Sequence, residues 1–72
     1  MNWYERHIKA GQLFKSTNIY YKTSDLTPVP LNTIALVVDL ETIAGNVSYL
    51  LGEQIYTMDA TSFLNIFARI DT

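Results

Sequence analysis

Hydrophobic and polar residues alternate through the middle of this chain in the way that is typical of β-strands. From residue 33 to residue 40, apolar and β-branched residues recur at every second position. The apolar residues of one face are Ile34, Leu36, Val38 and Leu40. Pro28 and Pro30 before this run, and Gly45 after it, limit the length that a helix would have. The pattern therefore predicts a strand, the first of three in a meander over residues 33–58.

The residues after this strand predict a hairpin closed by a two-residue turn, Gly52–Glu53. Gly52 can adopt a positive φ at the first central position of a type II′ turn, which suits the twist of antiparallel strands. Both faces of the hairpin carry apolar side chains, so we expect the sheet to be covered on both sides or curled on itself. The predicted register pairs Leu51 with Gln54, Leu50 with Ile55, Tyr49 with Tyr56, Ser48 with Thr57 and Val47 with Met58.

Shorter patterns before the meander predict the N-terminal elements. Residues 1–10 are expected to form an extension, helical or extended, whose Trp3 plugs an open end of the core. Residues 11–15 predict a first strand with Leu13 buried. Residues 18–22 are interpreted as a short strand or the start of a long loop.

The remaining segments complete an all-β arrangement. Residues 24–32 contain two prolines, which indicate a polyproline-like loop or a sheet edge. The polar break at residues 59–62 predicts one capped helical turn over Ser62–Asn65. Residues 66–70 predict a last strand.

Two runs of residues resemble parts of SH3-like barrels. The run from Lys9 to Lys15 is similar to the start of such barrels, although Gln12 stands where they usually have an acidic residue. The hairpin at Gly52 and the run from Ser62 to Ile66 are similar to their turn and last strand. The outline also resembles small uncharacterised phage and marine bacterial proteins. The resemblance implies a single domain over residues 1–72, with a small five-stranded SH3-like barrel over 11–70.

Composition excludes several classes of protein. At 72 residues with 49% hydrophobic and 17% charged residues, the chain is expected to be stabilised by packing rather than disordered. It has no cysteine, which excludes disulfides, thiolate zinc sites and iron–sulfur clusters. No run approaches the roughly 20 apolar residues of a membrane helix, and no signal-peptide core is evident. We expect a cytoplasmic protein without a membrane partner, located in the host cytoplasm or the virion if it is phage-encoded.

The sequence offers little for catalysis. His7 is the sole histidine and has no recognisable partner motif. Asp39 and Glu41 are two residues apart, but they are interpreted as a solvated strand end rather than a cation site. We therefore predict no catalytic, metal or cofactor-binding residues, no cofactor and no enzymatic activity.

We expect a non-catalytic protein-binding or assembly module that is phage-encoded and self-associates. Its partner would meet an aromatic surface or an exposed strand edge. The alternative is a nucleic-acid-binding small barrel, in which aromatic rings stack on bases beside lysines. A formal net charge of −2 neither favours nor excludes that alternative. The candidate partner-binding residues are Phe14, Lys15, Tyr20, Tyr21 and Lys22.

Overall fold

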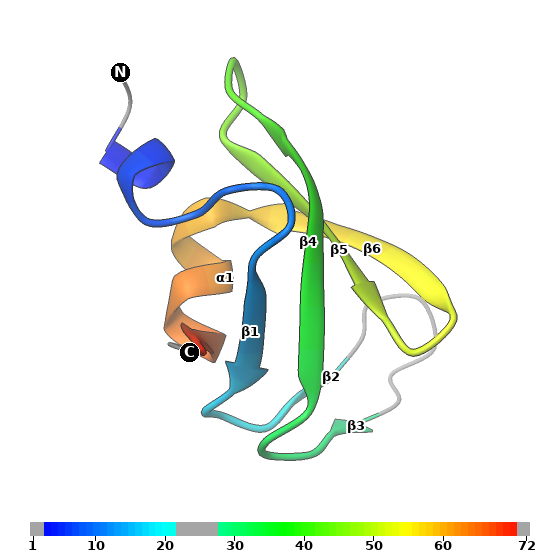
Figure 1. The fold of residues 1–72 in the computed structure, drawn as a ribbon. Coiled ribbons are helices and arrows are strands. Elements are labelled where there is room, and N and C mark those ends of the chain that lie inside the picture. The colour runs from blue at the N-terminus through cyan, green and yellow to red at the C-terminus, as the bar shows by residue number, and fades with distance from the viewer. Residues whose placement is uncertain (1–2, 22–27, 71–72) are drawn as a thin grey trace.

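The computed structural model describes residues 3–21 and 28–70 of the chain. Five of its strands form one antiparallel sheet in the order β6-β5-β4-β1-β7, and β2 pairs with β3 in a sheet of two strands (Figure 1). The fold is therefore mostly β, as the pattern predicts. The elements in chain order are the 3₁₀ helix η1 (Trp3–Arg6), β1 (Leu13–Ser16), β2 (Tyr20–Tyr21), β3 (Pro28–Val29), β4 (Ile34–Glu41), β5 (Asn46–Leu51), β6 (Gln54–Asp59), α1 (Ala60–Ile66) and β7 (Phe67–Arg69).

The five-stranded sheet is curved but open. Its edge strands, β6 and β7, do not pair with each other in the part of the chain that the structure describes, so the expected closed barrel is not formed. Only α1 connects these two edges, and its 7 residues span about 10 Å. The edges of a flat five-stranded sheet would lie about 19 Å apart. The sheet therefore bends, and α1 packs against β5, β6 and β7 on the inner side of the bend (Figure 1).

The β5–β6 hairpin has the predicted register at all five pairs, from Leu51 with Gln54 to Val47 with Met58. Gly52 has a φ of 67°, and no positive φ occurs at Glu53, as the predicted type II′ turn requires. The side-chain oxygens of Ser48 and Thr57, paired across the strands, are 3.1 Å apart. The predicted register of this hairpin is confirmed because it depends only on the turn between the two strands.

The strand predicted over residues 33–40 is confirmed by β4. The face of β4 that points into the core carries the smaller side chains. Ala35 and Val37 are fully buried, whereas Ile34 is exposed on the other face. The register with β5 shifts between Val37 and Asp39, which is a β-bulge.

Helix α1 is longer than the single turn that the sequence predicts. The carboxylate of Asp59 accepts a hydrogen bond of 3.0 Å from the backbone N–H of Ser62, which caps the first turn. The backbone N–H of Phe67 donates to the carbonyl of Phe63 at the other end. The helix contains no charged residue and is too short to span a membrane; in the described residues, no helix is long and apolar enough to do so.

The capping role of Asp59 leads to a pH-dependent prediction. Hydrogen bonds from Ser62 lower the pKa of Asp59 below its ordinary value of 3.8. A carboxyl group with a lowered pKa contributes stability above its unfolded-state pKa, and this contribution is lost as the pH falls through the folded-state pKa. We expect Asp59→Ala to lower the urea midpoint at pH 7, with a difference from wild type that shrinks below pH 3.8.

Asp39→Ala is the matched control for this prediction, because it removes one exposed carboxylate from the end of a strand. Urea unfolding of both variants, followed by circular dichroism at several pH values, measures the difference. Equal losses in the two variants at pH 7 would contradict the capping role.

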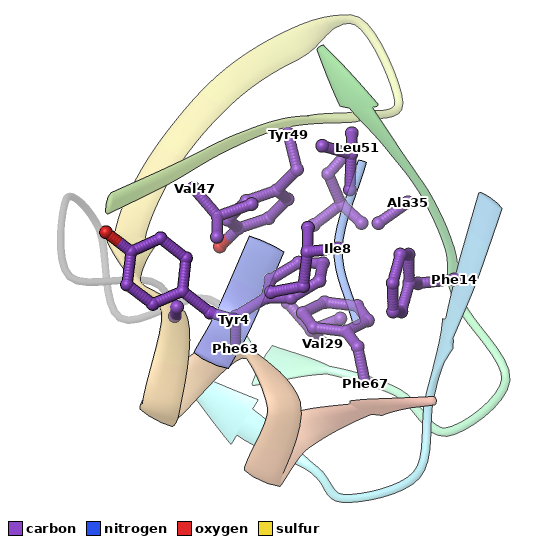
Figure 2. Packing of buried hydrophobic residues seen from close by; sticks show 12 residues of the cluster. Tyr4, Ile8, Phe14, Val29, Ala35, Val47, Tyr49, Leu51, Phe63 and Phe67 are labelled. Carbon is purple, nitrogen blue, oxygen red and sulfur yellow. The ribbon is translucent and has the colours of Figure 1, made fainter. Parts of the chain in front are cut away.

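The core lies between the inner face of the sheet and α1, and aromatic rings fill its centre (Figure 2). The ring of Phe63 lies 5.0 Å from that of Phe14, 5.3 Å from that of Tyr49 and 4.7 Å from that of Phe67, measured between centroids. The 12 buried hydrophobic residues are Tyr4, Ile8, Phe14, Val29, Ala35, Val37, Val47, Tyr49, Leu51, Ala60, Phe63 and Phe67.

The N-terminal prediction needs a correction. Trp3 is 51% exposed and does not plug the core; its neighbour Tyr4 is buried instead. The backbone carbonyl of Tyr4 accepts hydrogen bonds from the N–H groups of His7 and Ile8, and Ile8 is also fully buried. The segment before β1 therefore begins with the 3₁₀ helix η1, and its residues Tyr4 and Ile8 pack in the same core as the strands (Figure 2).

The first strand has the opposite orientation to the predicted one. Leu13 is 43% exposed and Phe14 is fully buried, because Phe14 faces Phe63 of α1 across the inner side of the sheet. The strand ends at Ser16, a buried hydroxyl. Its oxygen donates to the carbonyl of Pro30 at 2.6 Å and accepts from the N–H of Thr33 at 2.9 Å. Ser16 thus joins β1 to the segment between β3 and β4.

Candidate functional site

The structure separates the predicted partner-binding residues. Phe14 is fully buried among aromatic rings, so the prediction that it lies on a binding surface is wrong. Its ring packs against Phe63 of α1 instead. Lys15 is exposed on the outer side of β1, opposite Ile34 of β4 and Ala68 of β7.

The two tyrosines lie in a different sheet from Lys15. Tyr20 and Tyr21 form β2, and their backbones pair with Val29 and Pro28 of β3. The roles predicted for their side chains, and for Lys22, lie outside the described part of the chain. The candidate set is therefore divided between the core, the outer side of the large sheet and the two-stranded sheet.

Strand pairing aligns a second set of residues, on the outer side of the large sheet. Leu13 of β1 pairs with Leu36 of β4, Leu36 pairs with Leu50 of β5, and Leu50 pairs with Ile55 of β6. The backbone N–H of Ile70, just after β7, donates to the carbonyl of Leu13 at 3.0 Å. We call this set, which crosses the whole sheet, the outer apolar row: Ile70, Leu13, Leu36, Leu50 and Ile55.

The outer apolar row faces away from the core. Its end residue Ile55 is 62% exposed, and Leu13 is 43% exposed. Leu36 and Leu50 are half-buried, yet neither belongs to the core cluster or to the residues packed against it. Two further exposed side chains of β4 extend the surface beside the row: Ile34 and Val38, at 49% and 37% exposure.

The chemistry of this surface suits contact with another apolar surface. The row contains no ionisable group, and its neighbours Ser48 and Thr57 satisfy each other through their hydroxyls. Contiguous exposed apolar patches on protein surfaces often mark interaction sites. The outer apolar row is therefore the candidate functional site.

Sequence reasoning found part of this surface. It places Leu50 and Ile55 on one face of the hairpin, and Leu36 on one face of β4. It does not place Leu13 with them, because Leu13 was expected to be buried. The alternation of residues 11–16 does not say which side of the strand meets α1.

Two acidic residues, Glu41 and Asp59, accept hydrogen bonds from nearby backbone N–H groups; from the sequence, Glu41 is interpreted, with Asp39, as a solvated strand end. The carboxylate of Glu41 accepts hydrogen bonds of 2.8 Å and 2.7 Å from the N–H groups of Ile43 and Ala44, which fixes the loop between β4 and β5. Asp59 caps α1. Among the described residues, no group of three or more His, Cys, Asp or Glu side chains is arranged to hold a metal ion.

No protein-family model matches this chain, and none of the curated proteins or solved structures matches it either.

Proposed function

We propose that this protein is a non-catalytic assembly module that self-associates, with two copies meeting through their outer apolar rows. The observation that carries the proposal is the register that aligns five aliphatic residues across the sheet. Covering apolar surface stabilises a complex by about 25 cal/mol per Å². A second copy presents the same uncharged row, as a two-fold symmetric interface requires.

The size of the sheet fits this use. A standard interface covers about 800 Å² on each partner. The chain exposes 4739 Å² in total, so such an interface would cover about a sixth of its surface. The five strands have 3 to 8 residues, so the convex outer face of the sheet is about 24 Å wide along the bend and about 18 Å long, which is of the right order for a small dimer.

Two features support the finer description that the sequence resemblance implies. A long connection separates β1 from β4, and a short helix precedes the last strand, as in an SH3-like fold. The proposed module is an SH3-like sheet that stays open between β6 and β7, and is phage-encoded, acting in the host cytoplasm or the virion. The structural roles of Glu41 and Asp59 support a non-catalytic function, because the first carboxylate bonds the loop after β4 and the second caps α1.

Replacing two exposed residues of the row with lysine tests the proposal. We expect wild type to dimerise as its concentration rises from micromolar to millimolar, and Leu13→Lys/Ile55→Lys to remain monomeric, because the dimer would bury four unpaired charges. Sedimentation velocity measures the oligomeric state. Circular dichroism of the variant checks that the sheet is retained.

Ile43→Lys is the matched control. Ile43 is 97% exposed in the loop between β4 and β5 and lies outside the row. This variant is expected to dimerise like wild type. A wild-type protein that stays monomeric at millimolar concentration would rule out self-association, and equal effects of all the lysines would rule out this face.

Nucleic-acid binding remains the alternative, although the burial of Phe14 removes one of the rings that it would use. Binding of single-stranded RNA or DNA that weakens steeply with added salt would favour this alternative. No binding at low salt would eliminate it.

A further inference from the structure

A basic pocket lies at the end of the molecule where η1, β1, α1 and β7 meet. Its volume is about 380 Å³, and Phe14, Leu64 and Phe67 form its apolar part. Its polar part is formed by Arg6, His7 and Arg69. Phe14 and Phe67 belong to the core, so the pocket opens beside the inner side of the sheet, away from the outer apolar row.

The charge of this pocket differs from that of the chain. The protein has a formal net charge of −2 and only 5 lysines and arginines, yet two arginines and the sole histidine line this one pocket. None of the described lining residues is acidic. The fold brings these groups together from residues 6 and 7 near one end of the chain and residue 69 near the other.

Buried neighbouring residues fix the backbone at Arg6, His7 and Arg69. Arg6 and His7 lie between Tyr4 and Ile8, which are both in the core, and the carbonyl of Tyr4 accepts a 3.0 Å hydrogen bond from the N–H of His7. The ring of Trp3 lies 6.2 Å from that of His7. Arg69 is positioned by β7, where it pairs with Phe14 of β1. The backbone at these positions is thus fixed by the core, while the side chains of Arg6, His7 and Arg69 are exposed to solvent.

We propose that this pocket binds a small organic anion, a carboxylate or a phosphate monoester with an apolar group. The guanidinium group of Arg6 presents a planar set of N–H donors that matches the oxygens of either anion, and Arg69 adds a second positive charge to the lining. The ring N–H of His7 adds a donor, and Leu64 contacts the apolar group. A volume near 380 Å³ is at the lower end of the range for ligand pockets and fits a molecule of metabolite size.

Titration of the ¹⁵N-labelled protein with three probes of similar shape tests the proposal. The probes are benzoate, phenyl phosphate and the uncharged benzyl alcohol. We expect both anions to shift the amide signals of residues 6, 7 and 69 in a saturable way, and benzyl alcohol to leave them unchanged. A wild-type protein that shows no saturable shift with either anion overturns the proposal, as does equal binding of benzyl alcohol.

The matched variants are Arg6→Gln and Lys9→Gln. Each removes one exposed positive charge from the segment before β1, but only Arg6 lines the pocket. We expect Arg6→Gln to weaken anion binding about 10-fold, the loss of one charge-assisted hydrogen bond, and Lys9→Gln to change it less than about 2-fold. Equal weakening in the two variants indicates general charge attraction and overturns the site. Both variants keep the outer apolar row, so this outcome is independent of self-association.

Discussion

Phe63→Ala is expected to destabilise the fold by about 3–5 kcal/mol. Phe63 is fully buried, and its ring contacts rings from β1, β5 and β7. Truncation to alanine removes these contacts and leaves a cavity between the sheet and α1, where rings from four elements meet. A domain of this length has a total stability of only about 4–11 kcal/mol. The variant is therefore expected to lose about half of its stability and to unfold at a much lower urea concentration than wild type.

Urea unfolding followed by circular dichroism measures this loss. Phe63→Leu keeps much of the volume and is expected to lose less than half as much stability, because the cavity is smaller. Asn65→Ala, at an exposed position of the same helix, is expected to change stability by less than about 0.5 kcal/mol. If Phe63→Ala were no more destabilising than Asn65→Ala, the aromatic cluster would not be the centre of the core.

Ser16→Ala is expected to cost about 1–3 kcal/mol, although it removes a single oxygen. Ser16 is 1% exposed, and its hydroxyl both donates to the carbonyl of Pro30 and accepts from the N–H of Thr33. Its backbone also pairs with this segment, since the N–H of Ser16 donates to the carbonyl of Thr33 and the carbonyl of Ser16 accepts from the N–H of Asn32. Alanine leaves the N–H of Thr33 without its side-chain partner, whereas the carbonyl of Pro30 still accepts a hydrogen bond of 2.7 Å from the hydroxyl of Thr33.

The next residue provides a matched control. The hydroxyl of Thr17 also donates to a backbone carbonyl, that of Ile66 at 3.0 Å, but Thr17 is exposed. Water can replace that bond, so Thr17→Ala is expected to cost less than about 1 kcal/mol. Thermal unfolding of both variants gives the comparison, and similar losses would show that Ser16 is not a buried link between β1 and β4.

The parts of the fold that sequence predicts correctly are those set by local chemistry. A glycine that can adopt a positive φ fixes the turn at Gly52, and the turn fixes five residue pairs. The polar residues after Met58 correctly predict a capped helix. Its extra length was missed because Ala60 and Thr61 contain no signal that distinguishes a cap from a loop.

The wrong predictions concern structural features that depend on contacts between residues far apart in the chain. Alternation shows that Leu13 and Phe14 face opposite sides, but the buried side is decided by α1, about fifty residues later. Trp3 and Tyr4 present the same problem, because either ring suits a core. Closure of the barrel was expected from the number of strands, but it depends on whether β6 reaches β7.

The candidate sites also combine parts that local sequence predicts with parts that depend on long-range contacts. Two of the five residues of the outer apolar row are evident from one hairpin, whereas the other three need the pairing of β4 with β5 and of β1 with its neighbours. The basic pocket joins Arg6 to Arg69, and no spacing rule links residues so far apart. Ser16 has no sequence signal, because its importance comes from the two backbone groups that it meets.

The position of β1 between β4 and β7 has a consequence for the order in which the sheet assembles. Strands β4, β5 and β6 follow one another in the chain and can pair through short loops, which cost little entropy to close. Strand β1, by contrast, pairs with β4 and β7, which both follow it in the chain. Strand β7 lies near the opposite end of the chain. Pairings over such separations are slow to form. The hairpins therefore act as a template on which both ends of the polypeptide dock last, so the basic pocket is among the final parts of the molecule to form.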